Sequence, residues 1–269
     1  MELTYLGTAA AEGFPALFCR CRHCEEGRRL GGKNIRTRSQ ALVNRDLLID
    51  FPADTYWHMR QYGIEADAIP YLLLTHAHPD HLYTGDLLMR HTPYAHDMRA
   101  PALRILCSEA VSERLRAPLF GVEVTPIAPF ETVALGDYRI TALPARHAAA
   151  GEALLYLIRG ERTLLYAHDT GYPYEEVLTY LEGEHLALDM ISLDCTNGDL
   201  PIPDTGSHMG FPNIGRLLAR LRKSGVVTDR TVAYVNHFSH NARPLQDELE
   251  ARAREYGCHV AYDGCRVSF

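Results

Sequence analysis

The sequence lacks any run of about 18 apolar residues, which argues against a membrane-spanning helix. It also lacks a basic segment followed by an apolar one at residues 1–7, which read as the start of a strand, so no secretory signal is predicted. Internal repeats, low-complexity tracts and long linkers are missing as well. We therefore expect a cytoplasmic protein, folded as one domain over residues 1–269, whose 46% hydrophobic content is enough for a sizeable core.

Long blocks of charge of one sign are also absent, although the formal net charge is -7. Without a broad basic surface, the protein is not expected to bind the phosphate backbone of a nucleic acid. We therefore predict a small-molecule substrate, with neither nucleic acid nor membrane as a partner. A homodimer is the assembly we consider.

Cysteine is present in an odd number, seven. Three of these residues are crowded at Cys19, Cys21 and Cys24, which favours thiolate ligation of a metal over a disulfide framework in a chain without an export signal. The remaining ones are expected to be small buried apolar residues; these are Cys107, Cys195, Cys258 and Cys265.

Hydrophobic periodicity and turn residues predict hairpins first and then strands that alternate with helices. Strands are expected at 3–6, 40–43, 47–50, 71–74, 104–107, 138–143, 154–158, 163–166, 190–193, 231–235 and 259–262. Helices are expected at 52–62, 108–115, 174–181, 213–223 and 245–256. This order indicates a layered α/β sandwich of mixed sheets covered by helices, not a purely parallel doubly wound sheet.

The segment 75–81, Thr-His-Ala-His-Pro-Asp-His, follows the apolar run 71–74 and is the strongest functional motif. Imidazole nitrogens and a carboxylate oxygen are donors that a divalent metal ion accepts. Because neighbouring residues of a short loop face different ways, His76 and His78 can serve one ion while Asp80 and His81 serve a second. A solvated polar turn is the alternative, and it does not account for four donors in so short a segment.

One such segment cannot complete two coordination shells, so further ligands are expected at the ends of other strands. Three candidates stand at that position: His147, Asp169 and His237. Each one alone is more often an ordinary polar residue, but their recurrence at strand ends favours metal binding. Asp169 suits a bridging role, because its two oxygens can contact two cations and its charge offsets both.

The chain resembles the metallo-β-lactamase fold superfamily of metallohydrolases, whose signature is His-x-His-x-Asp-His followed by a later His, a bridging Asp and a final His. The resemblance implies a four-layer αβ/βα sandwich and two divalent ions, zinc or manganese or else iron. One ion would be bound by His76, His78 and His147 and the other by Asp80, His81 and His237, with Asp169 between them. It also implies that Asp50, at the end of an early strand, supports the metal loop.

The cysteine segment narrows the resemblance to the PhnP-like phosphodiesterases. Members of that branch carry a structural zinc site formed by a Cys-x-Cys-x-x-Cys loop and a His three residues after the last active-site His. Here this implies Cys19, Cys21, Cys24 and His240 as ligands of one zinc ion. Two alternatives stay open: His23 is a rival fourth ligand, and the thiols could be buried and free.

The same branch places a late loop His near the substrate phosphate, and His208 occupies that position. The hypothesis is that hydroxide activated by the metals attacks a cyclic phosphodiester and that His208 protonates the leaving oxygen. Asp80 and His208 are the predicted catalytic residues. By resemblance the substrate is 5-phospho-α-D-ribose 1,2-cyclic phosphate, which opens to ribose 1,5-bisphosphate. A solvated loop His is the alternative.

Other basic residues carry weaker signals. Arg36 or Arg38 could hold a terminal phosphate, although a solvated basic patch is the commoner interpretation of such a pair. His91 and His96 follow the metal loop, where substrate walls would form, and each is more often a surface residue. His168 should face away from Asp169 if both lie on one strand.

Other functions remain in competition with phosphodiester hydrolysis. A tRNA-processing nuclease shares the ligands but needs a basic arm, and a lactonase or thioesterase is chemically possible. A β-lactamase would need export and commonly replaces the bridging carboxylate by Cys. A non-catalytic zinc-knuckle RNA-binding module is the alternative from another class, against which the acidic balance speaks.

Overall fold

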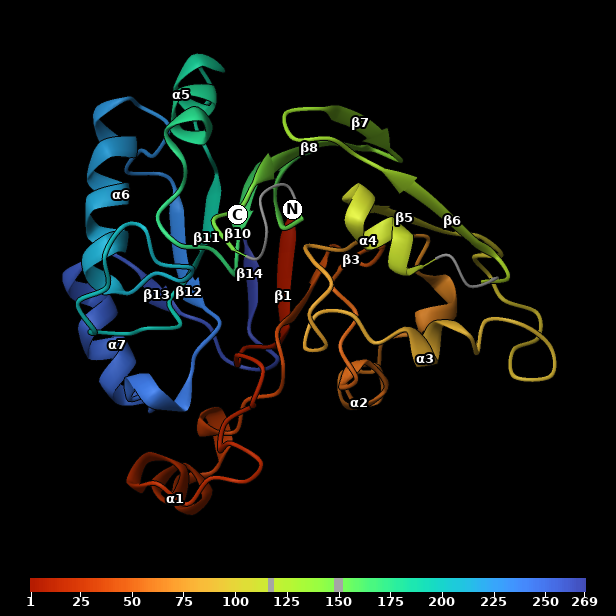
Figure 1. The fold of residues 1–269 in the computed structure, drawn as a ribbon, viewed down its shortest axis with the longest axis horizontal. Coiled ribbons are helices and arrows are strands. Elements are labelled where there is room, and N and C mark those ends of the chain that lie inside the picture. Colours follow the sequence, from red (N-terminus) through yellow and green to blue (C-terminus); the bar gives the residue numbers. More distant parts are fainter. Residues whose placement is uncertain (116–118, 148–151) are drawn as a thin grey trace.

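The computed structural model describes residues 1–115, 119–147 and 152–269, and in these residues two seven-stranded sheets face each other (Figure 1). The first sheet has the order β14-β1-β2-β3-β4-β5-β6. Its strands are β1 (Glu2–Gly7), β2 (Gln40–Val43), β3 (Leu47–Ile49), β4 (Tyr71–Leu73), β5 (Leu103–Cys107), β6 (Val122–Pro126) and β14 (Arg266–Ser268). Pairing is antiparallel from β14 to β3 and parallel from β3 to β6.

The second sheet repeats this plan with the order β13-β12-β11-β10-β9-β8-β7. Its strands are β7 (Thr132–Leu135), β8 (Tyr138–Pro144), β9 (Leu154–Arg159), β10 (Thr163–Ala167), β11 (Met190–Asp194), β12 (Val232–Asn236) and β13 (His259–Val260). Pairing is antiparallel from β7 to β10 and parallel from β10 to β13. Both sheets are therefore mixed, as the hairpin-then-alternation order predicted.

Helices cover the outer face of each sheet (Figure 1). The first sheet carries α2 (Thr55–Gln61), α3 (Thr84–Leu87) and α4 (Glu109–Arg114), and the second carries α5 (Glu175–Gly183), α6 (Phe211–Lys223) and α7 (Gln246–Glu255). A further helix, α1 (Arg22–Leu30), projects below both sheets, and single 3-10 turns occur at 32–34, 66–68 and 240–242. None of the described helices is long and apolar enough to cross a membrane. The four-layer αβ/βα sandwich is confirmed.

Three apolar clusters hold these layers together. The central cluster fills the space between the sheets and includes Leu3, Ile49, Tyr156 and Tyr166, all fully buried. The two outer clusters lie between each sheet and its helices. Because both faces of most central strands are covered, nearly all residues of those strands are buried and their sequences do not alternate between apolar and polar. The predicted strands and helices are all found, within a few residues of the expected bounds.

Some elements were not expected from the sequence. β6 and β7 are edge strands with few buried residues, since β6 has none and β7 has only Leu135, so neither shows a clear pattern of buried positions. β14 has only three residues and is defined by its pairing with β1. α1 begins inside the expected cysteine loop, so Cys21 is its N-cap and Cys24 lies in its first turn. All four additional cysteines are buried, as predicted.

Arg36 differs most from its expectation, because it belongs neither to a solvated patch nor to a substrate site. Its side chain is only 2% exposed and its guanidinium lies 4.5 Å from the ring of Phe238. One terminal nitrogen donates to Thr8 Oγ1 and to the carbonyl of Ala261, both at 2.8 Å, and the other donates to Gln246 Oε1 at 2.5 Å. Arg36 therefore links the N-terminal loops to the start of α7 and the segment after β13.

We expect Arg36→Met to lower the free energy of unfolding by about 3 kcal/mol, because three buried acceptors lose their donor. Urea unfolding measures the change. The exposed Arg230 offers a matched control, and Arg230→Met should stay within about 0.5 kcal/mol of the parent protein. Equal midpoints for the two variants would contradict this role.

Candidate metal centre and cysteine site

The candidate site lies where several strands of the two sheets end. β4 leads to the segment 75–81, and β8, β10 and β12 lead to His147, Asp169 and His237. Three of the residues that follow strands have left-handed backbone: Asp50 (φ 65°), Asp169 (φ 51°) and His237 (φ 63°). Such a conformation is uncommon outside glycine and is kept where surrounding contacts enforce it, typically at functional sites. The three residues with this conformation all have side chains in or beside the donor groups at the strand ends.

The first group of donors contains three histidines and a carboxylate. His76 Nε2 and His147 Nε2 each lie 3.0 Å from His78 Nδ1. Asp169 Oδ2 is 3.1 Å from His76 Nε2 and 3.8 Å from His147 Nε2. The structure therefore brings together the side chains predicted for the first metal, with one nitrogen of each ring directed at a common point.

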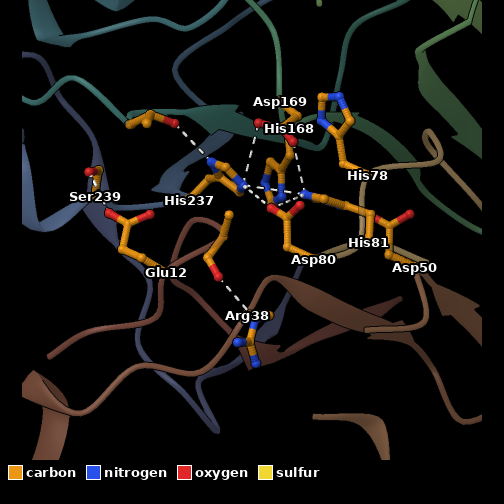
Figure 2. Close-up of polar contacts among 12 residues, drawn as sticks. Glu12, Arg38, Asp50, His78, Asp80, His81, His168, Asp169, His237 and Ser239 are labelled. Atoms are coloured by element: carbon orange, nitrogen blue, oxygen red, sulfur yellow. Dashed lines mark hydrogen bonds and ion pairs between the residues drawn. The ribbon is translucent and has the colours of Figure 1, made fainter. Parts of the chain in front are cut away.

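The second group shares Asp169 with the first. His81 Nε2 lies 2.8 Å from Asp169 Oδ2 and 3.3 Å from Asp80 Oδ2. His237 Nε2 lies 3.4 Å from Asp169 Oδ1 and 3.4 Å from His81 Nε2. Figure 2 shows these four side chains pointing toward one another. Asp169 thus stands between the groups, which is the geometry that a bridging ligand requires.

The donor set fits divalent cations. Four carboxylates are buried in or beside the groups, with exposures of 0% for Asp50, 7% for Asp80, 3% for Asp169 and 0% for Asp194. Among the described residues their ion-pair partners are histidines, with no lysine or arginine. Asp169 Oδ1 is also buried without a hydrogen-bond donor, although two ring nitrogens lie within 3.4 Å. Such a concentration of buried negative charge needs positive charge to balance it.

The pKa shifts of Asp169 and His81 agree with a site that binds cations. Burial by itself raises the pKa of Asp169, but His237 and His81 hold that pKa well below its usual range. For His81, burial lowers the pKa, and Asp50 and Asp169 together raise it well above the ordinary value. The site therefore keeps the carboxylate of Asp169, which both groups share, ionised and favours a cation beside it.

Asp50 supports the metal segment from behind, as the resemblance implied. Its Oδ2 lies 2.7 Å from His81 Nδ1, and its Oδ1 accepts the backbone N–H of Thr75 at 2.8 Å. A carboxylate on Nδ1 places the ring proton there and leaves Nε2 free to bind a metal. Figure 2 shows Asp50 next to His81, on the side away from the other donors.

His208 lies at the edge of the same site. Its Nδ1 is 3.0 Å from Asp194 Oδ2 and 3.2 Å from Asp169 Oδ1. Its loop can come this close because Gly171 has no side chain: a Cβ there would lie 1.8 Å from the carbonyl oxygen of Gly206. Burial opposes a charge on the ring, but Asp194 and Asp169 raise the pKa of His208 to about 9.

The cysteine site is assembled below the sheets. His240 Nδ1 lies 3.8 Å from Cys21 Sγ and 3.6 Å from Cys24 Sγ, and Cys19 belongs to the same group. A tetrahedral zinc ion would hold sulfur and nitrogen ligands about 3.6 Å apart, so the spacing fits. Backbone N–H groups point at the sulfurs, and that of Cys24, with His240, lowers the pKa of Cys21 to about 6. His23, the rival ligand, is not part of the group.

Two neighbouring contacts hold the cysteine site in place. Glu12 Oε1 accepts a hydrogen bond from Ser239 Oγ at 2.6 Å and from the backbone N–H of His240 at 3.2 Å, and Figure 2 shows Glu12 beside Ser239. Under α1, a Cβ on Gly27 would lie 2.8 Å from Phe14, so only glycine allows this helix to pack so closely. The sequence analysis did not single out these residues.

The other candidates lie outside the two groups. Arg38 is partly exposed, with Nη1 3.0 Å from Asp54 Oδ2, so its charge is already paired. His168 turns away and contacts Ser192 Oγ at 2.6 Å, as expected. His96 lines a cavity of about 940 Å³ between α2 and the segment after α3, which holds none of the donors. His91 lies 2.6 Å from the carbonyl of Thr92.

A smaller cavity of about 260 Å³ borders the metal groups themselves. Its lining includes His76 and His78 on one side and Ala110 and Val111 of α4 on the other. Residues of α4 therefore line the cavity beside the first metal group, and His91 and His96, which were considered for such a wall, do not. The small volume suits a small substrate.

The sequence analysis also missed Asp194 and Thr196 as functional residues. Thr196 Oγ1 lies 2.8 Å from His237 Nδ1, and Asp194 contacts His208. Asp194 is the last residue of β11, so the rule that selected His147, Asp169 and His237 at strand ends would have found it.

The family described as beta-lactamase superfamily domain matches residues 47–233. No curated protein sequence matches the chain significantly. Among solved structures, a diphosphatase described as from the PhnP family is similar at 22% identity, over 100% of this chain and 96% of that one, with a TM-score of 0.74.

Two further solved structures have the same fold. Zn²⁺-bound PqqB from Methylobacterium extorquens is 16% identical, over 100% of both chains, with a TM-score of 0.70. The short form of human tRNase Z is 14% identical, over 100% of this chain and 99% of that one, with a TM-score of 0.64. At these identities the likeness shows the fold alone, so the activity has to be argued from the side chains.

Proposed function

The chain belongs to the beta-lactamase superfamily, and we propose that within this superfamily of metal-dependent hydrolases it is a PhnP-like phosphodiesterase acting on a small cyclic phosphodiester. The observation that carries the proposal is the cysteine site, in which His240 joins the three thiols close to His237. The donors for two metals are common to the superfamily, whereas this additional group is the mark of the branch. The proposed substrate is 5-phospho-α-D-ribose 1,2-cyclic phosphate, with ribose 1,5-bisphosphate as product.

The protein side chains have separate tasks in this reaction. His76, His78 and His147 would hold one divalent ion, and Asp80, His81 and His237 the other, with Asp169 between them. When bound, two such ions supply an activated water and neutralise charge on phosphoryl oxygens. Zinc, manganese and iron all suit imidazole and carboxylate donors, so availability decides among them. A zinc ion at the cysteine site would have four protein ligands, which leaves no open position for a substrate.

His208 is the proposed general acid. Its Nδ1 faces Asp194 and Asp169, so Nε2, on the opposite edge of the ring, is the nitrogen left for the substrate. In the proposed step the phosphorus–oxygen bond to the sugar breaks, and the departing oxygen takes the Nε2 proton. Water supplies the hydroxide that joins phosphorus, and the proton that this water loses restores His208 through solvent, so atoms and charge balance without any further reactant.

We expect His208→Ala to lower kcat by about 100-fold on a cyclic phosphate while the metal content stays unchanged. Turnover should be measured on ribose cyclic phosphates, 2',3'-cyclic nucleotides, linear phosphodiesters, a lactone and a thioester. Wild-type cleavage of the lactone or thioester with no phosphodiester turnover would contradict the proposed substrate class. Retention of tRNA on a filter without cleavage would point instead to an RNA-binding module.

A second candidate activity is hydrolysis of a phosphoanhydride. It is favoured by the likeness to a structure described as a diphosphatase of the PhnP family, which covers the whole of this chain. Both reactions break a phosphorus–oxygen bond, so the same metal donors serve either. A diphosphate ester in the same panel separates them, because its leaving group is a phosphate and needs little help from His208.

A further inference from the structure

The turn after β11 contains a buried carboxylate, Asp194, that lies outside the two predicted metal groups and beside Asp169, His208 and His237. Asp194 is fully buried, and its Oδ1 accepts the backbone N–H groups of Thr196 and Met209, both at 3.0 Å. Its Oδ2 accepts from Thr196 Oγ1 and from His208 Nδ1, also at 3.0 Å. Four donors therefore converge on one anion, and two of them belong to side chains that contact the metal donors.

The first of these side chains is that of Thr196, which contacts His237. The Nε2 of His237 faces Asp169 and His81, so in a metal-binding role Nδ1 has to carry the ring proton. That proton is donated to Thr196 Oγ1 at 2.8 Å, and the Thr196 hydroxyl is then free to donate its own proton to Asp194. The direction of every hydrogen bond in this chain is set by the carboxylate, which can only accept.

The second side chain is His208 itself, which lies in a segment without regular secondary structure. The same turn holds its backbone: Asn197 donates from its backbone N–H to the carbonyl of Met209 at 3.0 Å and from Nδ2 to that of His208 at 3.2 Å. Asp194 therefore fixes the position of the loop through the Met209 N–H, and it places a proton on Nδ1 of His208.

We propose that Asp194 and Thr196 form one positioning device, which sets the proton positions of a metal ligand, His237, and of the general acid, His208, through a single carboxylate. The part that concerns His208 rests on the proposed function. The part that concerns His237 needs only the metal. A carboxylate behind a metal-binding His commonly acts in this way, and loss of such a partner weakens metal binding about 10- to 100-fold.

The metal arm compares Thr196→Val with Thr196→Ser. Manganese alone is the probe, because it binds carboxylate and imidazole donors and not the thiolates of the cysteine site. We expect Thr196→Val, which lacks the hydroxyl, to bind Mn²⁺ at least about 10-fold more weakly than the parent protein. Thr196→Ser keeps the hydroxyl and should recover affinity. Equal affinities of the parent protein and Thr196→Val would overturn this part.

The substrate arm uses Asp194→Asn and two leaving groups. With a cyclic sugar phosphate, whose leaving alkoxide needs a proton, we expect kcat to fall about 100-fold. With bis(p-nitrophenyl) phosphate, whose leaving group needs none, we expect a loss below about 5-fold when both rates are measured at saturating Mn²⁺, so that weaker metal binding through His237 does not enter. A merely structural defect lowers both rates equally, and that result would overturn the role of Asp194.

The two arms also separate this inference from the proposed function. A parent protein that cleaves no phosphodiester contradicts the proposed function, and the manganese affinities of the two Thr196 variants still decide the role of Thr196. Circular dichroism establishes whether Asp194→Asn folds. If Asp194→Asn does not fold, the Mn²⁺ affinities of Thr196→Val and Thr196→Ser still decide whether the Thr196 hydroxyl positions His237.

Discussion

Asp169→Asn is expected to lower the turnover of any phosphodiester substrate by at least about 1000-fold and to release the active-site metals. Asp169 is the one residue common to both donor groups, with ring nitrogens on each of its oxygens. An amide has the same shape but no negative charge, and it offers only one oxygen to two cations. The substitution therefore weakens both metal positions at once.

Elemental analysis and steady-state kinetics on one preparation measure this effect. Zinc bound at the proposed cysteine site should be retained, because none of the four side chains of that site belongs to a group with Asp169. Asp199 is an exposed carboxylate that pairs with Arg252, and Asp199→Asn is the matched control with unchanged activity. Asp169→Asn protein that keeps its active-site metals and more than about a tenth of its turnover would disprove the bridging role.

Cys24→Ser should have the largest effect on stability, a loss on the order of 5 kcal/mol of unfolding free energy at a fixed free zinc concentration. Cys24 is fully buried, and its sulfur lies 3.6 Å from His240 Nδ1. The site joins α1 to the segment that follows β12, regions far apart in the chain. Because a structural zinc ion binds the folded chain only, its binding energy adds directly to folding.

Chemical unfolding and zinc content test this prediction. His23→Ala is the control, because His23 stands between two of the cysteines in the sequence and yet lies outside the group. Its unfolding midpoint should match that of the parent protein. A His23→Ala variant as unstable as Cys24→Ser would show that the wrong fourth ligand had been assigned.

The side chains that meet in the two predicted metal groups could be selected from the sequence because each is marked locally. His76, His78, Asp80 and His81 are crowded into one short segment, and such a cluster is rare unless it binds a metal. His147, Asp169 and His237 follow apolar strands, and the ends of parallel strands meet at one edge of a sheet. Sequence proximity and a repeated structural position were sufficient.

Arg36 and Asp194 show where such reasoning ends. Arg36 stands in a polar segment and was expected in solvent or at a phosphate, but contacts from the segment after β13 and from α7 bury it. Asp194 needs His208 and Thr196 around it before its role can be seen. In both cases the partners are distant in the sequence, and no local pattern identifies them.

By itself, the sequence therefore determined the layered α/β class, most of the strands and helices, and the residue types offered to the metals, because these depend on periodicity and short spacing. The tertiary structure placed Asp169 between the two groups, as the sequence analysis had predicted. Only the tertiary structure decided that His240 rather than His23 meets the thiols, and that one carboxylate, Asp194, contacts both His208 and the Thr196 hydroxyl next to His237. These facts depend on strand order and on the approach of loops, which arise when the two sheets pack together.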